Sequence, residues 1–315
     1  MNLISMYLRK YRYAIFLNIA LVFCFVFNGY STTWYISPAG NDVTGDGTID
    51  NPWLTLHKAT VTVNIVGDII HVKAGTYVET EQCVLNVGVS IEGEGDVSVI
   101  KSVLTNPFIE TLSLSSDEEG IDGNQHISNL KFDGQNLSSY MAIVINGRSN
   151  VSIYNCTIVD FKDRGVIFSG RVDFTNFPPD SIYATGNKFY NNIVNNCAEF
   201  GDSTTGYYGR GCLNIGGQVG MLIYNNSITQ NSRPQGQNGW PIKYINDGYL
   251  KGCKIYNNTL KKIPFGGDHP GEGGWDFCIE LFHTQGLEIY NNTIQGSVDF
   301  NFSTKGTRSE EHTSE

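Results

Sequence analysis

The sequence has few charged side chains and no surplus of basic ones. Charged residues make up 17% of the 315 residues, and 21 Lys and Arg face 31 Asp and Glu, which gives a formal net charge of −10. A protein that binds nucleic acid needs a basic face to neutralise phosphates. The composition therefore argues against a nucleic-acid partner. It also disfavours other polyanions, unless local Lys, Arg or a divalent metal reverses the field.

The sequence also lacks two patterns that would indicate other kinds of protein. No stretch with a helical apolar period separates its strand-like segments, although a parallel α/β sheet would need helices there. Seven cysteines are present, but none is spaced as CxxC or as a zinc site. We expect the six that follow residue 31 to be small buried core residues, with a disulfide as the alternative in an exported protein.

Long apolar runs are rare, and the one near the N-terminus has the features of a secretory signal peptide. Three basic residues between positions 9 and 12 precede an apolar run from Ala14 to Phe27, and small residues follow it. The alternative is a membrane anchor, for which the run is short. We therefore expect residues 1–31 to be removed on export. This leaves a secreted or cell-surface protein without a membrane span.

The last eight residues, 308–315, differ in character from the rest of the chain. They match the translation of a common sequencing-library adapter, with a natural polar tail as the alternative. We expect the natural sequence to be interrupted near Thr307, so that the C-terminal part of the fold is truncated. The folded part is then expected within residues 32–307.

The strongest pattern is a short phrase that contains Tyr-Asn and recurs five times. The copies start at Ile153, Phe189, Ile223, Ile255 and Ile289, and their tyrosines lie 36, 34, 32 and 34 residues apart. A strand-like segment precedes each copy, so each repeat reads as one coil stacked in parallel on the last. This predicts an all-β fold, a right-handed parallel β-helix with Asn-rich repeats over about residues 127–296. The alternative, a β-propeller, lacks its blade signature here.

Stacked coils explain why Asn recurs. Equivalent residues lie about 4.8 Å apart in neighbouring strands, so Asn amides can hydrogen-bond to one another along the axis. We predict that the first Asn after each Tyr forms this column, while Cys156 takes the adjacent buried position. The predicted column consists of Asn155, Asn191, Asn225, Asn257 and Asn291.

The N-terminal segment resembles a known family. The stretches 35–48, 51–59 and 67–77 resemble the opening of secreted bacterial proteins with the pectin-lyase fold, including the small domain of unknown function that begins many of them. The resemblance covers about residues 33–101 and implies a first strand, a short capping helix and a first coil. Leu54 to Val66 matches that helix, with Thr55 as its N-cap. The resemblance also implies that polysaccharides lie along the outer face of one parallel sheet.

Candidate site residues on that face follow from strand alternation. Residues between inward apolar pairs point outward. Alignment of the strands that precede the repeats gives one outward column of Val144, Ile167, Asn214, Lys243 and Glu280. We predict Lys243, Glu280 and His283, just beyond the same strand, as catalytic residues, and Asn214 as a substrate-binding residue. The alternative for Lys243 and Glu280 is a solvated ion pair of little energetic value.

Three long inserts lead into the polar strands, at residues 196–210, 230–240 and 264–277. We predict that they form the walls of a shared binding site. Asp276 is predicted as a further catalytic carboxylate, and Asp268 and Glu272 as ligands of a Ca²⁺ ion. The substrate-binding residues predicted in or beside these inserts are Tyr208, Arg210, Arg233, Trp240 and Trp275. Ordinary variation in loop length is the alternative.

These residues suit two classes of enzyme and one non-catalytic protein. A polysaccharide lyase needs a base and charge neutralisation beside a uronic acid, which Lys243 with Arg210 or Arg233 would supply. A glycoside hydrolase needs two carboxylates, which Glu280 with Asp276 or Asp247 would supply. Fold analogy favours the lyase. The alternative is a non-catalytic glycan-binding protein or stalk, and in each case we expect a monomer with a polysaccharide partner.

Overall fold

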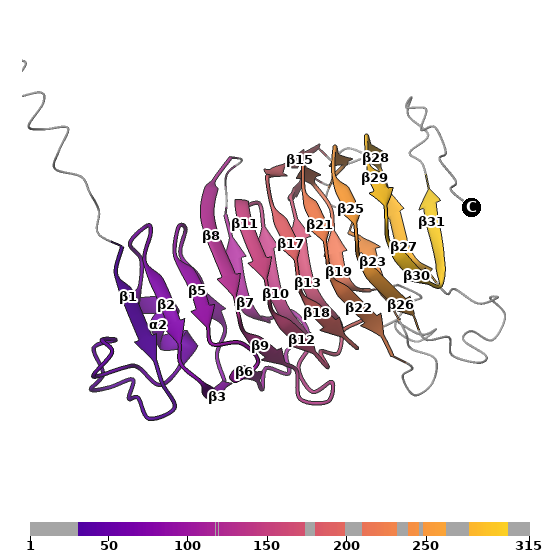
Figure 1. Cartoon of the computed structure of the whole chain (residues 1–315). Coiled ribbons are helices and arrows are strands. Elements are labelled where there is room, and N and C mark those ends of the chain that lie inside the picture. Colours follow the sequence, from indigo (N-terminus) through magenta and orange to yellow (C-terminus); the bar gives the residue numbers. More distant parts are fainter. Residues whose placement is uncertain are drawn as a thin grey trace, which may run out of the picture.

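The chain winds as a parallel β-helix whose sheets run along the length of the molecule (Figure 1). The computed structural model describes residues 31–116, 118, 120–173, 180–198, 210–231, 239–245, 248–262 and 277–301. Within them, the antiparallel pairing joins strands β14 (Arg171–Asp173) and β15 (Asp180–Ile182), and the long sheets are parallel. The predicted fold class, a right-handed parallel β-helix with a short N-terminal capping helix, is confirmed.

Three long sheets and one small sheet form the walls of the coil. Sheet A contains, in spatial order, β1 (Thr33–Ile36), β2 (Ile69–Val72), β5 (Ser90–Gly93), β8 (Asp122–Ser128), β11 (Ser149–Tyr154), β17 (Lys188–Tyr190), β21 (Leu222–Tyr224), β25 (Lys254–Tyr256) and β29 (Glu288–Tyr290). Sheet B contains β3 (Gly75–Glu79), β6 (Ser98–Ser102), β9 (Lys131–Asp133), β12 (Thr157–Val159), β18 (Ile193–Asn195), β22 (Ser227–Gln230), β26 (Thr259–Lys262) and β30 (Thr293–Gln295). Sheet C contains β4 (Cys83–Val84), β7 (Glu110–Ser115), β10 (Met141–Asn146), β13 (Arg164–Ser169), β19 (Gly211–Ile215), β23 (Trp240–Tyr244), β27 (Phe277–Phe282) and β31 (Ser297–Asn301). The small sheet contains β16 (Ala184–Thr185), β20 (Gln218–Val219), β24 (Leu250–Lys251) and β28 (Thr284–Gln285).

One coil passes through the sheets in a fixed order. The chain runs from β19 in sheet C through β20 in the small sheet to β21 in sheet A and β22 in sheet B, and β23 then starts the next coil. Equivalent strands therefore pair in parallel from coil to coil. Sequence positions that share a place in the repeat consequently lie side by side on the same face.

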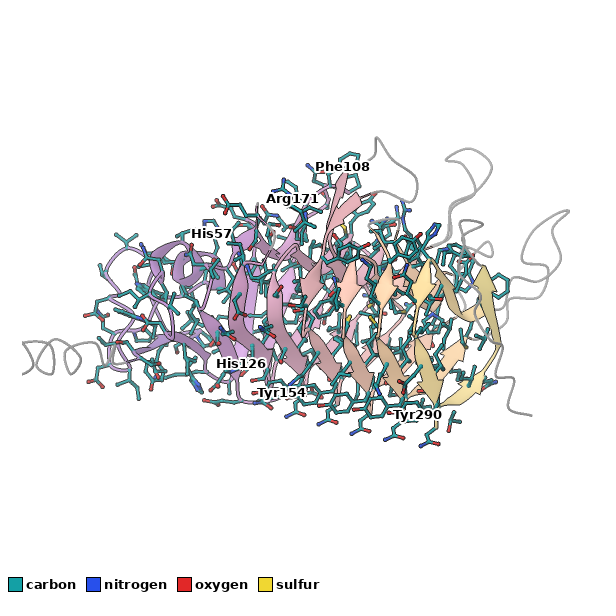
Figure 2. The ribbon with its side chains drawn as sticks, turned by 90° about the horizontal axis from the view of Figure 1, so that it is seen from above. His57, Phe108, His126, Tyr154, Arg171 and Tyr290 are labelled. Carbon is teal, nitrogen blue, oxygen red and sulfur yellow. The ribbon has the colours of Figure 1, made fainter. Side chains whose placement is uncertain are left out.

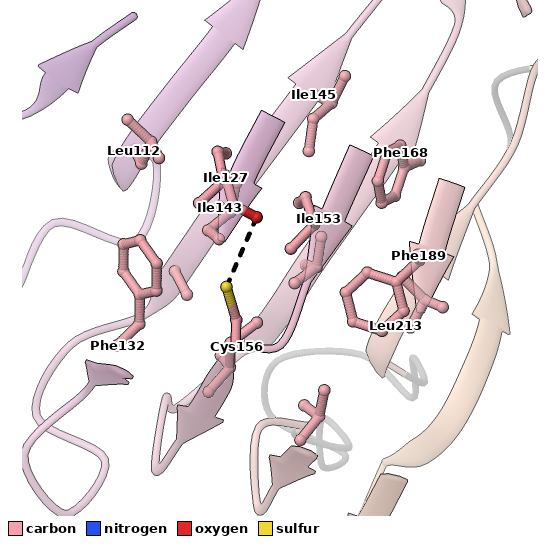
Figure 3. Close-up of a cluster of buried hydrophobic side chains, with 14 of the residues drawn as sticks. Leu112, Ile127, Phe132, Ile143, Ile145, Ile153, Cys156, Phe168, Phe189 and Leu213 are labelled. Carbon is pink, nitrogen blue, oxygen red and sulfur yellow. Dashed lines mark hydrogen bonds between the residues drawn. The ribbon is translucent and has the colours of Figure 1, made fainter. Parts of the chain in front are cut away.

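The interior of the coil is filled by inward side chains from all the long sheets. Ile143, Ile153, Phe168, Phe189 and Leu213 are fully buried, and Figure 3 shows how they pack together. β-Branched and aromatic residues favour strands because they pack well on a pleated surface. The cysteines after residue 31 all lie buried in this interior, as expected.

A column of hydrogen-bonded Asn side chains is present, as predicted. It is formed by the second Asn of each repeat, so the prediction that the first Asn forms it is wrong. At the turn between sheets A and B, the side-chain Oδ1 of Asn226 accepts the backbone N–H of Asn192 at 3.0 Å and the side-chain Nδ2 of Asn192 at 3.1 Å. Asn226 donates in turn to Asn258 Oδ1 at 2.9 Å and to the carbonyl of Phe189 at 2.9 Å. Asn292 continues this Asn ladder beyond Asn258.

The first Asn of each pair turns the chain instead. These residues are exposed and adopt φ between +53° and +56°, a left-handed conformation that Asn tolerates better than most residues. They are Asn155, Asn191, Asn225, Asn257 and Asn291. Cys156 occupies the buried position beside the first of them, and Asn192 Oδ1 accepts its backbone N–H at 3.0 Å. The two Asn positions therefore have separate roles.

The N-terminal end of the coil is covered by helix α2 (Leu56–Thr62), which is shorter than the predicted Leu54–Val66. Thr55 is the N-cap, as predicted, and its side chain accepts the backbone N–H of Lys58. The β-branched residues at positions 60–63 disfavour a longer helix, and Val63 is already extended. Among the described residues, no helix has the length and apolar character of a membrane span.

A buried carboxylate completes this cap. Glu79 of β3 accepts the backbone N–H groups of Leu56 and His57 at 2.7 and 3.1 Å. These N–H groups belong to the first turn of α2 and have no partner within the helix. Burial raises the pKa of Glu79, which opposes the effect of these hydrogen bonds.

The Asn ladder makes a testable contribution to stability. Asn226→Ala would remove the acceptor for the N–H of Asn192 and the donor to the carbonyl of Phe189, both in a buried turn. We expect the free energy of unfolding, measured with urea, to fall by about 3 kcal/mol. The matched control is Asn225→Gly, which keeps the left-handed turn at an exposed position and should change stability by only a few tenths of a kcal/mol. Equal losses in the two variants would contradict the ladder.

Candidate functional site

The outward column predicted on sheet C is present. The strand pairings place Val144 beside Ile167, Ile167 beside Asn214, Asn214 beside Lys243 and Lys243 beside Glu280. The inward neighbours on these strands, such as Ile215 and Ile242, are fully buried. The polar residues predicted from the sequence therefore share one face of sheet C.

The polar end of this column holds an enclosed ion pair. Lys243 Nζ contacts Glu280 Oε2, and the two side chains are only 13% and 9% exposed. The Lys243 ammonium also lies 5.0 Å from the ring centre of Trp240 and 4.9 Å from that of Phe282. Aromatic faces attract cations at these distances. The pair is therefore largely out of water, where two charges interact more strongly than in a solvated surface pair and are costly to separate.

The side-chain amide of Asn214, next to Lys243 in the column, is hydrogen-bonded within its own strand. Its Nδ2 donates to the carbonyl of Gly211 at 2.7 Å, and its Oδ1 accepts the N–H of Gly211 at 3.2 Å. Gly211 also makes room for the lysine, since a Cβ at this position would lie 2.7 Å from Lys243 Cβ. Asn214 therefore shapes the strand beside Lys243, while its amide is engaged within the protein.

Arg210 lies at the start of β19 and forms an ion pair that the sequence did not predict. Its Nε donates to Asp163 Oδ1 at 2.9 Å, and the other oxygen of Asp163 accepts from Arg164 at 2.7 Å. The carbonyl of Arg210 accepts the backbone N–H of Trp240 at 2.8 Å. The structure thus brings Arg210 and Trp240 to the same edge of sheet C and directs the guanidinium of Arg210 to Asp163.

His283 lies beyond the opposite end of β27, as predicted, in an aromatic environment. It adopts φ +52° and is 8% exposed. Its ring packs edge-to-face against Tyr244 and Tyr249, at 5.4 and 5.8 Å between ring centres. Burial lowers the pKa of His283, so the neutral ring is favoured.

Aromatic side chains lie at both ends of the strands that carry the ion pair. The sequence predicted only Trp240 among them as a site residue. Phe277 stacks on Trp240 at one edge, with 6.1 Å between ring centres. At the other edge, Phe282 packs against Tyr244 at 5.8 Å. Strand alternation could have identified Phe282, since it is two residues after Glu280 and therefore on the same face. Trp240 is fully buried, whereas Phe277 and Phe282 are partly exposed and could pack against a sugar.

Several predicted residues lie outside the described part of the chain. They are Tyr208, Arg233, Asp268, Glu272, Trp275 and Asp276. The proposed wall of inserts and the predicted Ca²⁺ ligands therefore stay predictions. Among the residues that the structure does describe, no group of three or more His, Cys, Asp and Glu side chains is arranged to hold a metal ion. Near the N-terminus, the carboxylate of Asp46 accepts the backbone N–H of Thr48 at 3.0 Å.

No family model and no curated protein matches the chain. Solved structures do. A tailspike protein, gp49, from Acinetobacter baumannii bacteriophage Fri1, described as a capsular polysaccharide depolymerase, has a TM-score of 0.50 and 11% identity, covering 75% of this chain and 42% of its own. The Dettilon tailspike protein gp208 has a TM-score of 0.51 and 13% identity, covering 87% of this chain and 47% of its own. The chain thus spans less than half of either tailspike, and the likeness shows the fold alone.

Because His283 is buried, we predict that the stability of the protein depends on pH. The unfolded chain protonates this side chain near its ordinary pKa of 6.5, whereas folded His283 protonates only at lower pH. The stabilising contribution is therefore complete above pH 6.5 and is lost as the pH falls toward the folded pKa. We expect the His283→Asn variant, which tolerates positive φ, to lose less stability than the wild type between pH 6.5 and 5. Identical pH profiles in urea unfolding would contradict this assignment.

Proposed function

We propose that this protein binds a polysaccharide along the outer face of sheet C and cleaves it there. The observation that carries the proposal is the enclosed pair of Lys243 and Glu280 in the outward column of sheet C. A charged pair held out of water on the outer face of a solenoid is an expensive arrangement for stability alone. Ionisable groups that are held out of water beside a charged partner are candidates for functional sites.

Two further observations support a carbohydrate ligand. Two partly exposed rings, Phe277 and Phe282, lie at opposite ends of the strand that carries Glu280. The fold is shared with a phage tailspike described as a capsular polysaccharide depolymerase. Fold analogy is a weak argument for function, so the side chains beside Lys243 carry more of the proposal than the likeness does.

The ion pair suits elimination at a uronic acid better than hydrolysis. A uronate carboxylate could replace Glu280 as the partner of the Lys243 ammonium, which would neutralise the charge that builds up when the neighbouring carbon loses its proton. Released Glu280 could accept that proton. The electron pair of the broken C–H bond would form the new double bond as the glycosidic oxygen leaves with a proton from water. An ammonium already bound to a carboxylate is better placed to neutralise charge than to act as a base.

A non-catalytic glycan-binding protein is the second candidate. It is favoured by the hydrogen bonds that occupy the amide of Asn214 and the ion pair that occupies Arg210. These contacts leave fewer polar groups at the column for chemistry. Both candidates place the ligand on the outer face of sheet C, and they differ in whether a product forms.

Replacement of Lys243 tests the proposal. We expect wild-type protein to release unsaturated uronate ends, read by ultraviolet absorbance, from at least one of pectate and alginate, with and without added Ca²⁺. Lys243→Met should reduce this rate by about 100-fold or more, because the developing charge loses its neutralising group. Lys188→Met, at an exposed position on sheet A, is the matched control and should leave the rate unchanged.

Because Lys243→Met leaves Glu280 enclosed without its partner, the double variant Lys243→Met, Glu280→Leu serves as a check on folding. It should regain the wild-type unfolding midpoint without regaining activity. Full activity in either variant would refute the proposed site. Neutral glycans are tested in the same way, with reducing ends as the product. If the wild type binds any of these glycans and forms no product, the non-catalytic candidate is favoured.

A further inference from the structure

A second array of side chains follows the turn between sheets A and B, away from the candidate site on sheet C. Three neighbouring positions of each repeat contribute to it, and we refer to them together as the Tyr ridge. It consists of Tyr154, Tyr190, Tyr224, Tyr256 and Tyr290, of Asn155, Asn191, Asn225, Asn257 and Asn291, and of Thr157, Ile193, Ser227, Thr259 and Thr293. In Figure 2, Tyr154 and Tyr290 lie along one outer edge of the molecule.

The tyrosines of the ridge form a continuous stack. Their ring centres are 4.9, 4.8, 5.1 and 5.1 Å apart, and neighbouring planes are tilted by no more than 9°. The ring faces therefore cover one another, and the ring edges with their hydroxyl groups remain for contacts with a ligand. Burial and the neighbouring phenols raise the pKa of Tyr190 and Tyr224. The hydroxyl groups thus stay protonated and can both donate and accept.

Most polar groups of the ridge have no hydrogen-bonding partner in the described part of the chain. No described residue hydrogen-bonds to a ridge phenol, or to the side-chain amides of Asn191, Asn225, Asn257 and Asn291. By contrast, the amide next to each of these in sequence is fully engaged in the Asn ladder. Among the first Asn residues of the repeats, Asn155 has such a bond within the described part of the chain: its Nδ2 donates to Asn129 Oδ1 at 3.3 Å. The ridge therefore offers a periodic set of available hydrogen-bonding groups.

The ridge is also uncharged. None of its positions is Lys, Arg, His, Asp or Glu, although the chain as a whole carries a net charge of −10. An anionic polymer would gain nothing from these side chains, and the nearest charges on sheet A are mixed, with Lys188 and Lys254 beside Glu288. A protein partner would require an apolar interface core, whereas the exposed positions here are mostly amides and hydroxyls. The charge and polarity of the ridge therefore match a neutral, hydroxyl-rich ligand.

We propose that the Tyr ridge binds an extended, uncharged β-1,4-linked glycan that lies parallel to the axis of the coil. Successive sugar rings of such a glycan advance by a distance close to the coil spacing, so each ring can meet one Tyr–Asn pair. The contacts then repeat along the chain, and each added coil strengthens binding by a multivalent effect. This site is separate from sheet C and does not depend on the activity proposed there.

Two ridge variants test the proposal. The triple variant Tyr190→Phe, Tyr224→Phe, Tyr256→Phe removes hydroxyl groups and keeps the stack. The triple variant Asn191→Gly, Asn225→Gly, Asn257→Gly removes amides and keeps the left-handed turns. We expect the wild-type chain to sediment with microcrystalline cellulose, chitin or insoluble β-mannan, and not with the coiled α-linked chains of starch. Each triple variant should bind at least about tenfold more weakly, since three hydrogen bonds of modest net strength are lost.

The control variant is Val43→Ser, at an exposed position near the N-terminus, which should bind these glycans as the wild type does. Unchanged binding in both ridge variants, an equal loss in Val43→Ser, or equal binding to starch would each overturn the proposal. So would a lack of binding to all three β-1,4-linked glycans. The molar mass in solution, measured by light scattering, tests one more alternative. A wild-type dimer that dissociates in the ridge variants would show that the ridge binds a second copy of this chain instead.

Discussion

Registered stacking of one coil on the next is the constraint on which the rest of this structure depends. Backbone hydrogen bonds between parallel strands set the spacing, and the Asn ladder fixes the register at the turn between sheets A and B. A slip of one residue would bring every inward side chain to the outer face. It would also leave buried N–H groups such as that of Asn192 without an acceptor, at a cost of about 1–3 kcal/mol for each group.

The same register produces two different surfaces. At the Tyr ridge the repeat is kept, so like side chains lie side by side and form a periodic, uncharged array. On sheet C the repeat is broken, because the column changes from Val144 and Ile167 to Asn214, Lys243 and Glu280. A repeated surface suits a repeating polymer, whereas a departure from the repeat creates one distinct position along it. Binding at several coils and chemistry at a single coil are thus compatible in one solenoid.

The sequence predicted those features that depend on local periodicity. Strand alternation gave the inward residues and the outward column of sheet C, and the equal spacing of the repeats gave the coil. It did not show which Asn of each pair is buried, because Asn recurs at both positions and the two differ in backbone conformation. Nor did it predict the pairing of Arg210 with Asp163, 47 residues away, or the use of the Asn214 amide by Gly211. These contacts depend on how the coils meet in space.

Disulfide trapping tests the register most directly. Ser227 pairs with Thr259 on the exposed face of sheet B, and Thr229 pairs with Lys261 two residues further along. Parallel neighbours about 4.8 Å apart lie within the Cα separation that a disulfide allows, whereas residues two positions out of register do not. The account predicts that Ser227→Cys with Thr259→Cys forms a disulfide under mild oxidation, detected by mass spectrometry, while Ser227→Cys with Lys261→Cys does not. Efficient cross-linking of the second pair and not the first would contradict it.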